Sequence, residues 1–164
     1  MIFGDERRFA IRAEREMVRE AIVFGNVNIV VAGEEIGDRS IRVILNTVAS
    51  EFAGFLAGQG YRGAEEYWLL SPSDAIAKIW AARFGPTDDY DFTNEMAAAR
   101  YILCPGPGEA FDGFCVVVLE GKETDRVIWR HGQAQSVSFV DLAQSQYLDP
   151  LRQFVEWLLP GVHP

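Results

Sequence analysis

The hydrophobic residues of this chain change their spacing near Ser40, and the change separates two kinds of structure. From Phe9, apolar residues alternate with charged ones, which is typical of a strand with one solvated face. After Ser40, apolar residues recur at intervals of three and four as far as Leu56, which predicts an amphipathic helix ended by Gly58 and Gly60. We therefore expect the strands and this helix to bury their apolar faces against each other.

Further strands are predicted on both sides of that helix. Residues 21–32 are rich in Val and Ile and should form the hairpin partner of the first strand. A short third strand is expected at residues 34–36, between two glycines. Residues 110–121 have a continuous apolar centre, which predicts a central strand, and residues 126–131 alternate as its hairpin partner would.

Helix signals occur at two later points. Ser71, followed by Pro72 and Asp74, is a capping pattern that predicts a helix as far as the Gly-Pro pair at 85–86. Residues 94–101 fit one short helical stretch. The sequence Ser-Phe-Val-Asp at 138–141 resembles a second cap, and we expect a long C-terminal helix after it that Pro150 kinks or restarts.

This order of elements predicts an α+β protein rather than a parallel α/β protein. Strands and helices do not alternate strictly, so the expected architecture is an antiparallel sheet with helices packed mainly on one face. The chain of 164 residues has the length of one domain. We find no repeat or linker in it, and we expect a single domain over residues 1–164.

The charge of the chain restricts its partners. The formal net charge is -9 and the pI is about 4.7, which argues against binding to nucleic acids or to anionic membranes. The charge suits a cationic protein partner, although solubility alone also accounts for it. We expect no signal peptide, because charges follow a very short apolar start, and we see no membrane-spanning segment. These features predict a cytoplasmic protein.

Few residues in the chain are suited to catalysis. The two histidines are His131 and the penultimate residue His163, which is too few for a histidine-based metal site or a catalytic triad. The glycine-rich stretches lack the features of phosphate-binding loops. Cys104 and Cys115 are expected to be reduced thiols, with Cys115 buried. We expect no catalytic residue, metal or cofactor. A small carboxylate-dependent hydrolase and a ligand-binding or adaptor module remain as alternatives.

Carboxylates that stand beside aromatic residues are the best candidates for a binding surface. Aromatic side chains provide contact area and carboxylates pair with Lys and Arg. For Trp68 a buried segment with Leu69 and Leu70 is the better explanation, whereas Tyr90 fits a contact surface. Further acidic groups occur at residues 38, 120, 123 and 125. The candidates for contact with a partner are Glu34, Glu35, Glu65, Glu66, Asp88, Asp89, Tyr90 and Asp91.

The N-terminal third resembles a known family. Met-Ile-Phe-Gly-Asp at residues 1–5 with Arg-Phe-Ala-Ile at 8–11, the strand Phe-Gly-Asn-Val-Asn-Ile at 24–29, and the turn of Gly33 and Ile-Gly-Asp at 36–38 are similar to the immunity protein 42 family. The resemblance implies a bacterial inhibitor that binds the C-terminal domain of a cognate polymorphic or contact-dependent toxin in the cytoplasm and covers its active site or a surface near it. It implies no catalytic residues. Many toxin domains are cationic nucleases, and an acidic inhibitor would associate quickly with such a toxin.

Overall fold

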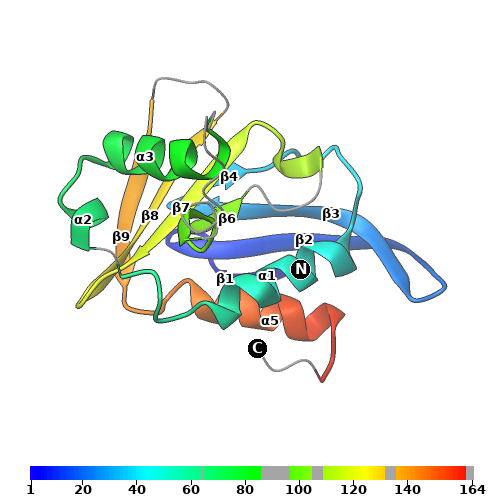
Figure 1. The fold of residues 1–164 in the computed structure, drawn as a ribbon. Coiled ribbons are helices and arrows are strands. Elements are labelled where there is room, and N and C mark those ends of the chain that lie inside the picture. The colour runs from blue at the N-terminus through cyan, green and yellow to red at the C-terminus, as the bar shows by residue number, and fades with distance from the viewer. Residues whose placement is uncertain (64, 86–96, 105–108, 132–135, 162–164) are drawn as a thin grey trace.

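The computed structural model describes residues 1–63, 65–85, 97–104, 109–131 and 136–161. Its first sheet contains β1 (Ile2–Asp5), β2 (Phe9–Arg19), β3 (Ile22–Val31) and β4 (Glu34–Ile36) in that order, and β5 (Val43–Ile44) also pairs with β3. Every pairing in this sheet is antiparallel. The β2–β3 hairpin is the longest, and its tip extends beyond the helices (Figure 1).

The second sheet is a four-stranded meander. It consists of β6 (Ile102–Cys104), β7 (Phe114–Glu120), β8 (Thr124–His131) and β9 (Ser138–Ala143), again with antiparallel pairs only. A short 3₁₀ helix, η1 (Glu109–Phe111), precedes β7. The predicted α+β class with antiparallel pairing is confirmed, and the strands divide between two sheets.

The helices fill the space beside these sheets. α1 (Leu45–Ala57) and α5 (Leu148–Leu158) pack on each other and cover one face of the first sheet (Figure 1). α3 (Pro72–Phe84) lies against the outer face of the second sheet, and the short helix α2 (Glu65–Trp68) precedes it. Ser71 caps α3 by accepting a hydrogen bond from the amide of Asp74, as the sequence predicted.

Alternation along β7 places its residues in two apolar clusters. Val116 and Val118 face the main core, which also includes residues of the first sheet, α1 and α5. Val117 and Leu119 point the other way, toward Ile76 and the rest of α3. The second sheet is therefore covered on both faces, which explains the continuous apolar run in β7.

Two predicted helix starts are wrong. Residues 138–143 form the strand β9, because their side chains alternate between the core and solvent and Asp141 pairs across the strands with Arg126. The C-terminal helix begins at Leu148, with Pro150 in its first turn, so the predicted restart is confirmed. The helix after Ser40 begins later than the periodicity indicates, because residues 43 and 44 pair with β3 as β5.

Both cysteines are buried thiols. Burial raises the pKa of the Cys115 thiol to about 12, although the nearby charge of Arg130 opposes the shift. Cys115 is thus a small apolar side chain of the core, as expected. Among the helices that the structure describes, none has the length and hydrophobicity of a bilayer-spanning helix.

Candidate functional site

The four described glutamates among the predicted contact residues lie in two places. Glu34 and Glu35 belong to β4, whereas Glu65 and Glu66 form the first turn of α2. β8 relates the two places, because Glu34 contacts Trp129 near the end of this strand and Glu65 shares a cleft with Thr124 at its start. Five residues of strand span about 17 Å. The two pairs therefore belong to separate surfaces, and Asp88, Asp89, Tyr90 and Asp91 lie outside the described residues.

Three of these four glutamates already have partners within the chain. Glu34 accepts a hydrogen bond of 2.8 Å from the indole nitrogen of Trp129, and Glu35 forms an ion pair with Arg12. Glu66 pairs with Lys78 at 3.5 Å. Within the described chain, the carboxylate of Glu65 has no ion-pair partner. Glu65 is therefore the member of the set whose charge is most available to another molecule.

Glu65 lines a cleft of about 660 Å³ between α2, the loop after α1 and the β7–β8 turn. We call this the α2 cleft, and it lies at the end of the molecule opposite the hairpin tip (Figure 1). Its lining contains four carboxylates, one lysine, and two apolar side chains from the C-terminal end of α2 and the residue after it. These residues are Glu65, Glu120, Glu123, Asp125, Lys122, Trp68 and Leu69.

The wall of the cleft is organised around Glu120, the last residue of β7. Its Oε2 accepts hydrogen bonds from the backbone amides of Gly60 (2.7 Å) and Arg62 (3.2 Å). Its Oε1 accepts from the hydroxyl of Tyr147 at 2.7 Å and from Nη1 of Arg62 at 2.8 Å. One carboxylate thus holds the loop after α1 against β7 and joins both to the chain at the start of α5.

The guanidinium of Arg62 is the cationic centre of this arrangement. Its side chain has 0 % exposure, and the guanidinium stacks on the ring of Phe55 with 3.7 Å between Cζ and the centroid. Besides Glu120, it donates to the carbonyl oxygen of Arg100 at 2.8 Å and to that of Phe55. A buried charge requires such compensation, because leaving water is costly for an ion.

Burial and hydrogen bonding shift the pKa values of Glu120 and Asp125 in opposite directions. Burial would raise the pKa of Glu120, but the donors on Tyr147 and Arg62 and the charge of Arg62 outweigh it, so this pKa is lowered. Burial dominates at Asp125 and raises its pKa, although the amides of Ser145 and Gly121 donate to its carboxylate. Glu120 is thus held as an anion.

Trp68 is a fixed wall of the α2 cleft. Its indole nitrogen donates to the carbonyl oxygen of Glu120 at 3.2 Å, and the guanidinium of Arg126 lies over its ring, 4.4 Å from the centroid. Arg126 is itself held by two hydrogen bonds to Asp141. Leu69, the next residue, is 82 % exposed. The expectation that Trp68 is part of a buried segment holds for its half-buried ring but not for Leu69.

Glu35 belongs to a second, more open groove of about 700 Å³. Asp38, Glu109 and Asp112 share this groove with Arg39 and His131. Glu109 and Asp112 are far from β4 in sequence, and they come close because the Asp38 amide donates to the carbonyl oxygen of Ala110 at 2.6 Å. No local pattern in the sequence indicates that contact.

The arrangement of acidic groups is suited to binding cations on another macromolecule. Among the residues that the structure describes, no group of three or more His, Cys, Asp or Glu side chains is placed to hold a metal ion. The acidic residues 120, 123 and 125 are visible in the sequence, but no pattern there places them beside Glu65 or marks Arg62 as buried. A single arginine in the loop Gly-Tyr-Arg-Gly at residues 60–63 gives no signal of its burial.

Comparison with known proteins gives two matches. A crystal structure of CdiI from Burkholderia dolosa AUO158 superposes with a TM-score of 0.74 and 16% sequence identity, covering 96% of this chain and 99% of that chain. At this identity the likeness shows the fold. No curated protein matches the sequence.

The second match concerns the family suggested by the N-terminal residues. The family model described as Immunity protein 42 matches residues 1–157, so the match extends far beyond the first third. The predicted family is confirmed, and with it the role of a toxin-neutralising immunity protein. The chain belongs to the immunity protein 42 family.

Proposed function

We propose that this immunity protein neutralises its cognate toxin domain by binding it at the α2 cleft. The observation that carries the proposal is the placing of the exposed carboxylates Glu65 and Glu123 around one concave surface that also presents Trp68 and Leu69, with Glu120 and Asp125 in its inner wall. A charged rim around apolar contact area is the usual composition of a protein interface. The inhibitor acts by occupying the toxin surface, without catalysis of its own, in the bacterial cytoplasm.

The chemistry of the cleft favours a cationic toxin domain. Glu65 and Glu123 are exposed, and Lys122 is the one basic residue among the lining side chains. A nuclease needs positive charge to hold phosphate, so an acidic inhibitor can cover the surface that such an enzyme uses. The net charge of -9 would further speed the encounter through long-range attraction.

The walls of the cleft are fixed before any partner arrives. The loop after α1 is tied to Glu120, and Trp68 is hydrogen-bonded to the same residue. A preorganised surface loses little conformational entropy on binding, which leaves more of the contact energy for affinity. Glu34, which binds Trp129, and Glu66, which binds Lys78, are better explained as parts of the fold.

Charge reversal in the cleft tests this proposal. The double variant Glu65→Lys/Glu123→Lys should slow association with the toxin domain encoded beside this gene by on the order of tenfold or more at low salt. It should also abolish protection of cells that express the toxin. The matched control is Glu109→Lys/Asp112→Lys, which changes the net charge equally at exposed residues outside the cleft.

The two levels of the proposal fail differently. If the unmodified chain neither binds nor protects against that toxin domain, its assignment as the cognate inhibitor is wrong. If it binds and the cleft variant behaves like the control, the contact surface lies elsewhere and the α2 cleft is excluded. Stopped-flow association at two salt concentrations and a survival assay supply both measurements.

A further inference from the structure

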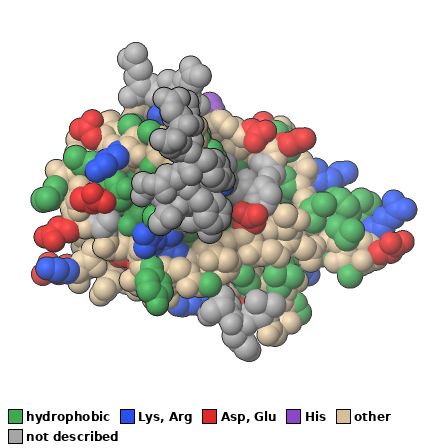
Figure 2. All heavy atoms as spheres, viewed as in Figure 1, with side chains coloured by type: hydrophobic (Ala, Val, Ile, Leu, Met, Phe, Trp, Pro, Cys, Tyr) green, Lys and Arg blue, Asp and Glu red, His purple; other side chains and the backbone are tan. Residues whose placement is uncertain are grey.

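The tip of the β2–β3 hairpin is unusually apolar for an exposed surface. Ten large hydrophobic residues are exposed in the described chain, and four of them lie here: Met17 (45%), Val18 (64%), Ile22 (42%) and Ile44 (40%). Figure 2 shows hydrophobic side chains over this end of the hairpin with basic and acidic side chains beside them. Single exposed apolar residues are ordinary, whereas a group of them marks a contact surface.

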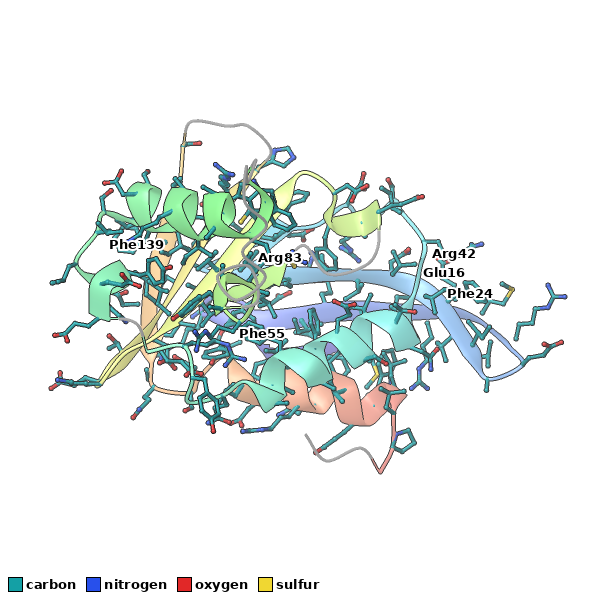
Figure 3. The ribbon with its side chains drawn as sticks, in the orientation of Figure 1. Glu16, Phe24, Arg42, Phe55, Arg83 and Phe139 are labelled. Carbon is teal, nitrogen blue, oxygen red and sulfur yellow. The ribbon has the colours of Figure 1, made fainter. Side chains whose placement is uncertain are left out.

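The strand register places most of these side chains in one row. Phe24 pairs with Met17 on β2 and with Ile44 on β5, so the three residues lie side by side across three strands. Their neighbours Val23 and Val43 belong to the core, and successive side chains in a strand alternate between faces. The row therefore occupies the face that α1 and α5 leave uncovered, where Figure 3 places Phe24 with Glu16 and Arg42.

Ile22 lies on the same face as this row, two residues from Phe24 along β3 toward the turn. We call Met17, Ile22, Phe24 and Ile44 the hairpin patch. No helix among the described residues covers this patch, and it lies at the opposite end of the molecule from α2 (Figure 1). It is consequently separate from the surface proposed for the toxin.

The charges around the hairpin patch cancel, unlike those of the whole chain. At the tip of the hairpin, Glu14, Glu16 and Glu20 are balanced by Arg19, by Arg42 and by Arg15, whose guanidinium lies over Trp157 on the other face. The chain as a whole has a net charge of -9, which repels a second copy of itself. That repulsion is weakest at this neutral tip, and a strongly cationic partner gains little there.

The charges on the patch face are also ordered. Glu14 pairs with Asn26 on the side of the row nearer the body of the sheet, and Arg19 pairs with Ile22 on the side nearer the turn. A two-fold axis that runs along the row, parallel to the sheet and between the two copies, turns the patch faces toward each other and exchanges these two sides. It places Arg19 of each copy over Glu14 of the other while the apolar rows meet.

We propose that the hairpin patch is the interface of a homodimer in which two copies of this chain pack face to face around that axis. The patch is self-complementary, as an isologous interface must be. Its small size and the repulsion between two acidic chains imply weak association, with a dissociation constant on the order of 10 µM. The inference does not depend on the identity of the toxin or on the α2 cleft.

Sedimentation velocity of the full chain over about 1–200 µM tests the dimer, a range that brackets the expected dissociation constant. The unmodified protein should shift from monomer to dimer, and Met17→Glu should weaken the association by about tenfold or more, because a buried carboxylate would interrupt the row. Phe139→Glu, at an exposed apolar residue of β9 (49%) that belongs neither to the hairpin patch nor to the α2 cleft, is the matched control and should dimerise normally. Circular dichroism melts confirm that each variant is folded.

Charge exchange tests the proposed symmetry. Arg19→Glu should weaken the dimer by placing two carboxylates together, and the double variant Arg19→Glu/Glu14→Arg should restore it, because the opposite charges face each other again. A monomer at every concentration overturns the proposal, as does a Met17→Glu variant that dimerises like the unmodified protein. Failure of the double variant to recover excludes the two-fold arrangement. Loss of toxin binding in Met17→Glu without any dimer in the unmodified chain assigns the patch to the toxin instead.

Discussion

Arg62 and Glu120 form a buried ion pair in which Nη1 and Oε1 are 2.8 Å apart. The pair connects the loop after α1 to the last residue of β7, and Tyr147 joins it from the chain before α5. Three segments that are distant in sequence therefore meet at two charged side chains. The shape of the α2 cleft depends on this pair, because Gly60 and Trp68 are also bound to Glu120.

Removal of the guanidinium should strongly destabilise the protein. Arg62→Met leaves the carboxylate of Glu120 in a largely buried site without its cation, and we expect a loss of about 3–5 kcal/mol in the free energy of unfolding. Arg62→Lys should recover only part of this loss, because an ammonium group cannot reach the several acceptors that the planar guanidinium serves. Urea denaturation at neutral pH measures both variants.

Arg152→Met provides the comparison for that experiment. Arg152 is a half-exposed arginine of α5 that pairs with Asp149 at 3.3 Å and donates to Gln59 at 2.7 Å, and its loss should cost less than about 1 kcal/mol. Equal effects of the two substitutions would show that the buried pair has no special importance.

The lowered pKa of Glu120 predicts a specific dependence of stability on pH. Because its pKa in the folded protein lies below the ordinary value of 4.5, its stabilising effect is complete above that pH. The effect declines as the pH falls below about 4.5 and is lost once the pH passes below the folded pKa. Glu120→Gln should be less stable by about 1–3 kcal/mol at neutral pH, and the difference from the unmodified protein should shrink in acid.

Urea denaturation at a series of pH values from neutral to acidic compares the two proteins. The pKa of Asp125 is raised instead. Protonation of this buried carboxylate therefore stabilises the folded protein as the pH falls. The comparison removes the part of this contribution that comes from burial, the largest cause, while the smaller part that comes from the charge of Glu120 is absent in Glu120→Gln. A difference that stays constant down to pH values below the folded pKa of Glu120 would contradict the assignment.

The hydrogen bond between Trp129 and Glu34 connects the two sheets. The indole nitrogen on β8 donates to a carboxylate oxygen on β4 at 2.8 Å, and bonds to charged acceptors are stronger than neutral ones. Glu34→Ala should lower the free energy of unfolding by about 1–2 kcal/mol. Thermal unfolding followed by tryptophan fluorescence detects it, and Glu123→Ala, an exposed glutamate in the β7–β8 turn, should have no comparable effect.

Gly4 cannot be replaced without strain. Its φ is +97°, and a Cβ at this position would lie 2.5 Å from the carbonyl oxygen of Phe9 and 2.5 Å from the ring of Pro150. Gly4→Ala should therefore cost about 1–3 kcal/mol, from the backbone conformation and from the contact with α5. Gly54→Ala, at a helical glycine with open space around its Cα, should instead stabilise the protein slightly in the same melting experiment.

The sequence predicted elements whose signals are local. The β2–β3 hairpin follows from alternation and from Val and Ile, and the start of α3 follows from Ser71 and Pro72. Residues 138–141 show the limit of such signals, because one short polar pattern fits both a helix cap and a strand. The pairing of β9 with β8 decides between them, and that pairing depends on residues beyond the pattern.

The sequence indicated individual residues of the candidate site but not how they come together in space. Glu65 was recognised as acidic beside an aromatic residue, but its partners in the α2 cleft come from the β7–β8 turn, more than fifty residues later. Arg62 is an ordinary charged residue in the sequence, and its burial results from three segments that converge on it. The resemblance in the first third of the chain identified the family without locating either feature.

The two buried thiols can report local unfolding of the protein. Cys104 and Cys115 lie in separate apolar clusters, one with the first sheet and one beneath α3, and Cys115 stays protonated at neutral pH because its pKa is about 12. Alkylating reagents attack the thiolate and need access to it. Labelling at each cysteine would thus report separately when α3 lifts from the second sheet and when the main core is breached.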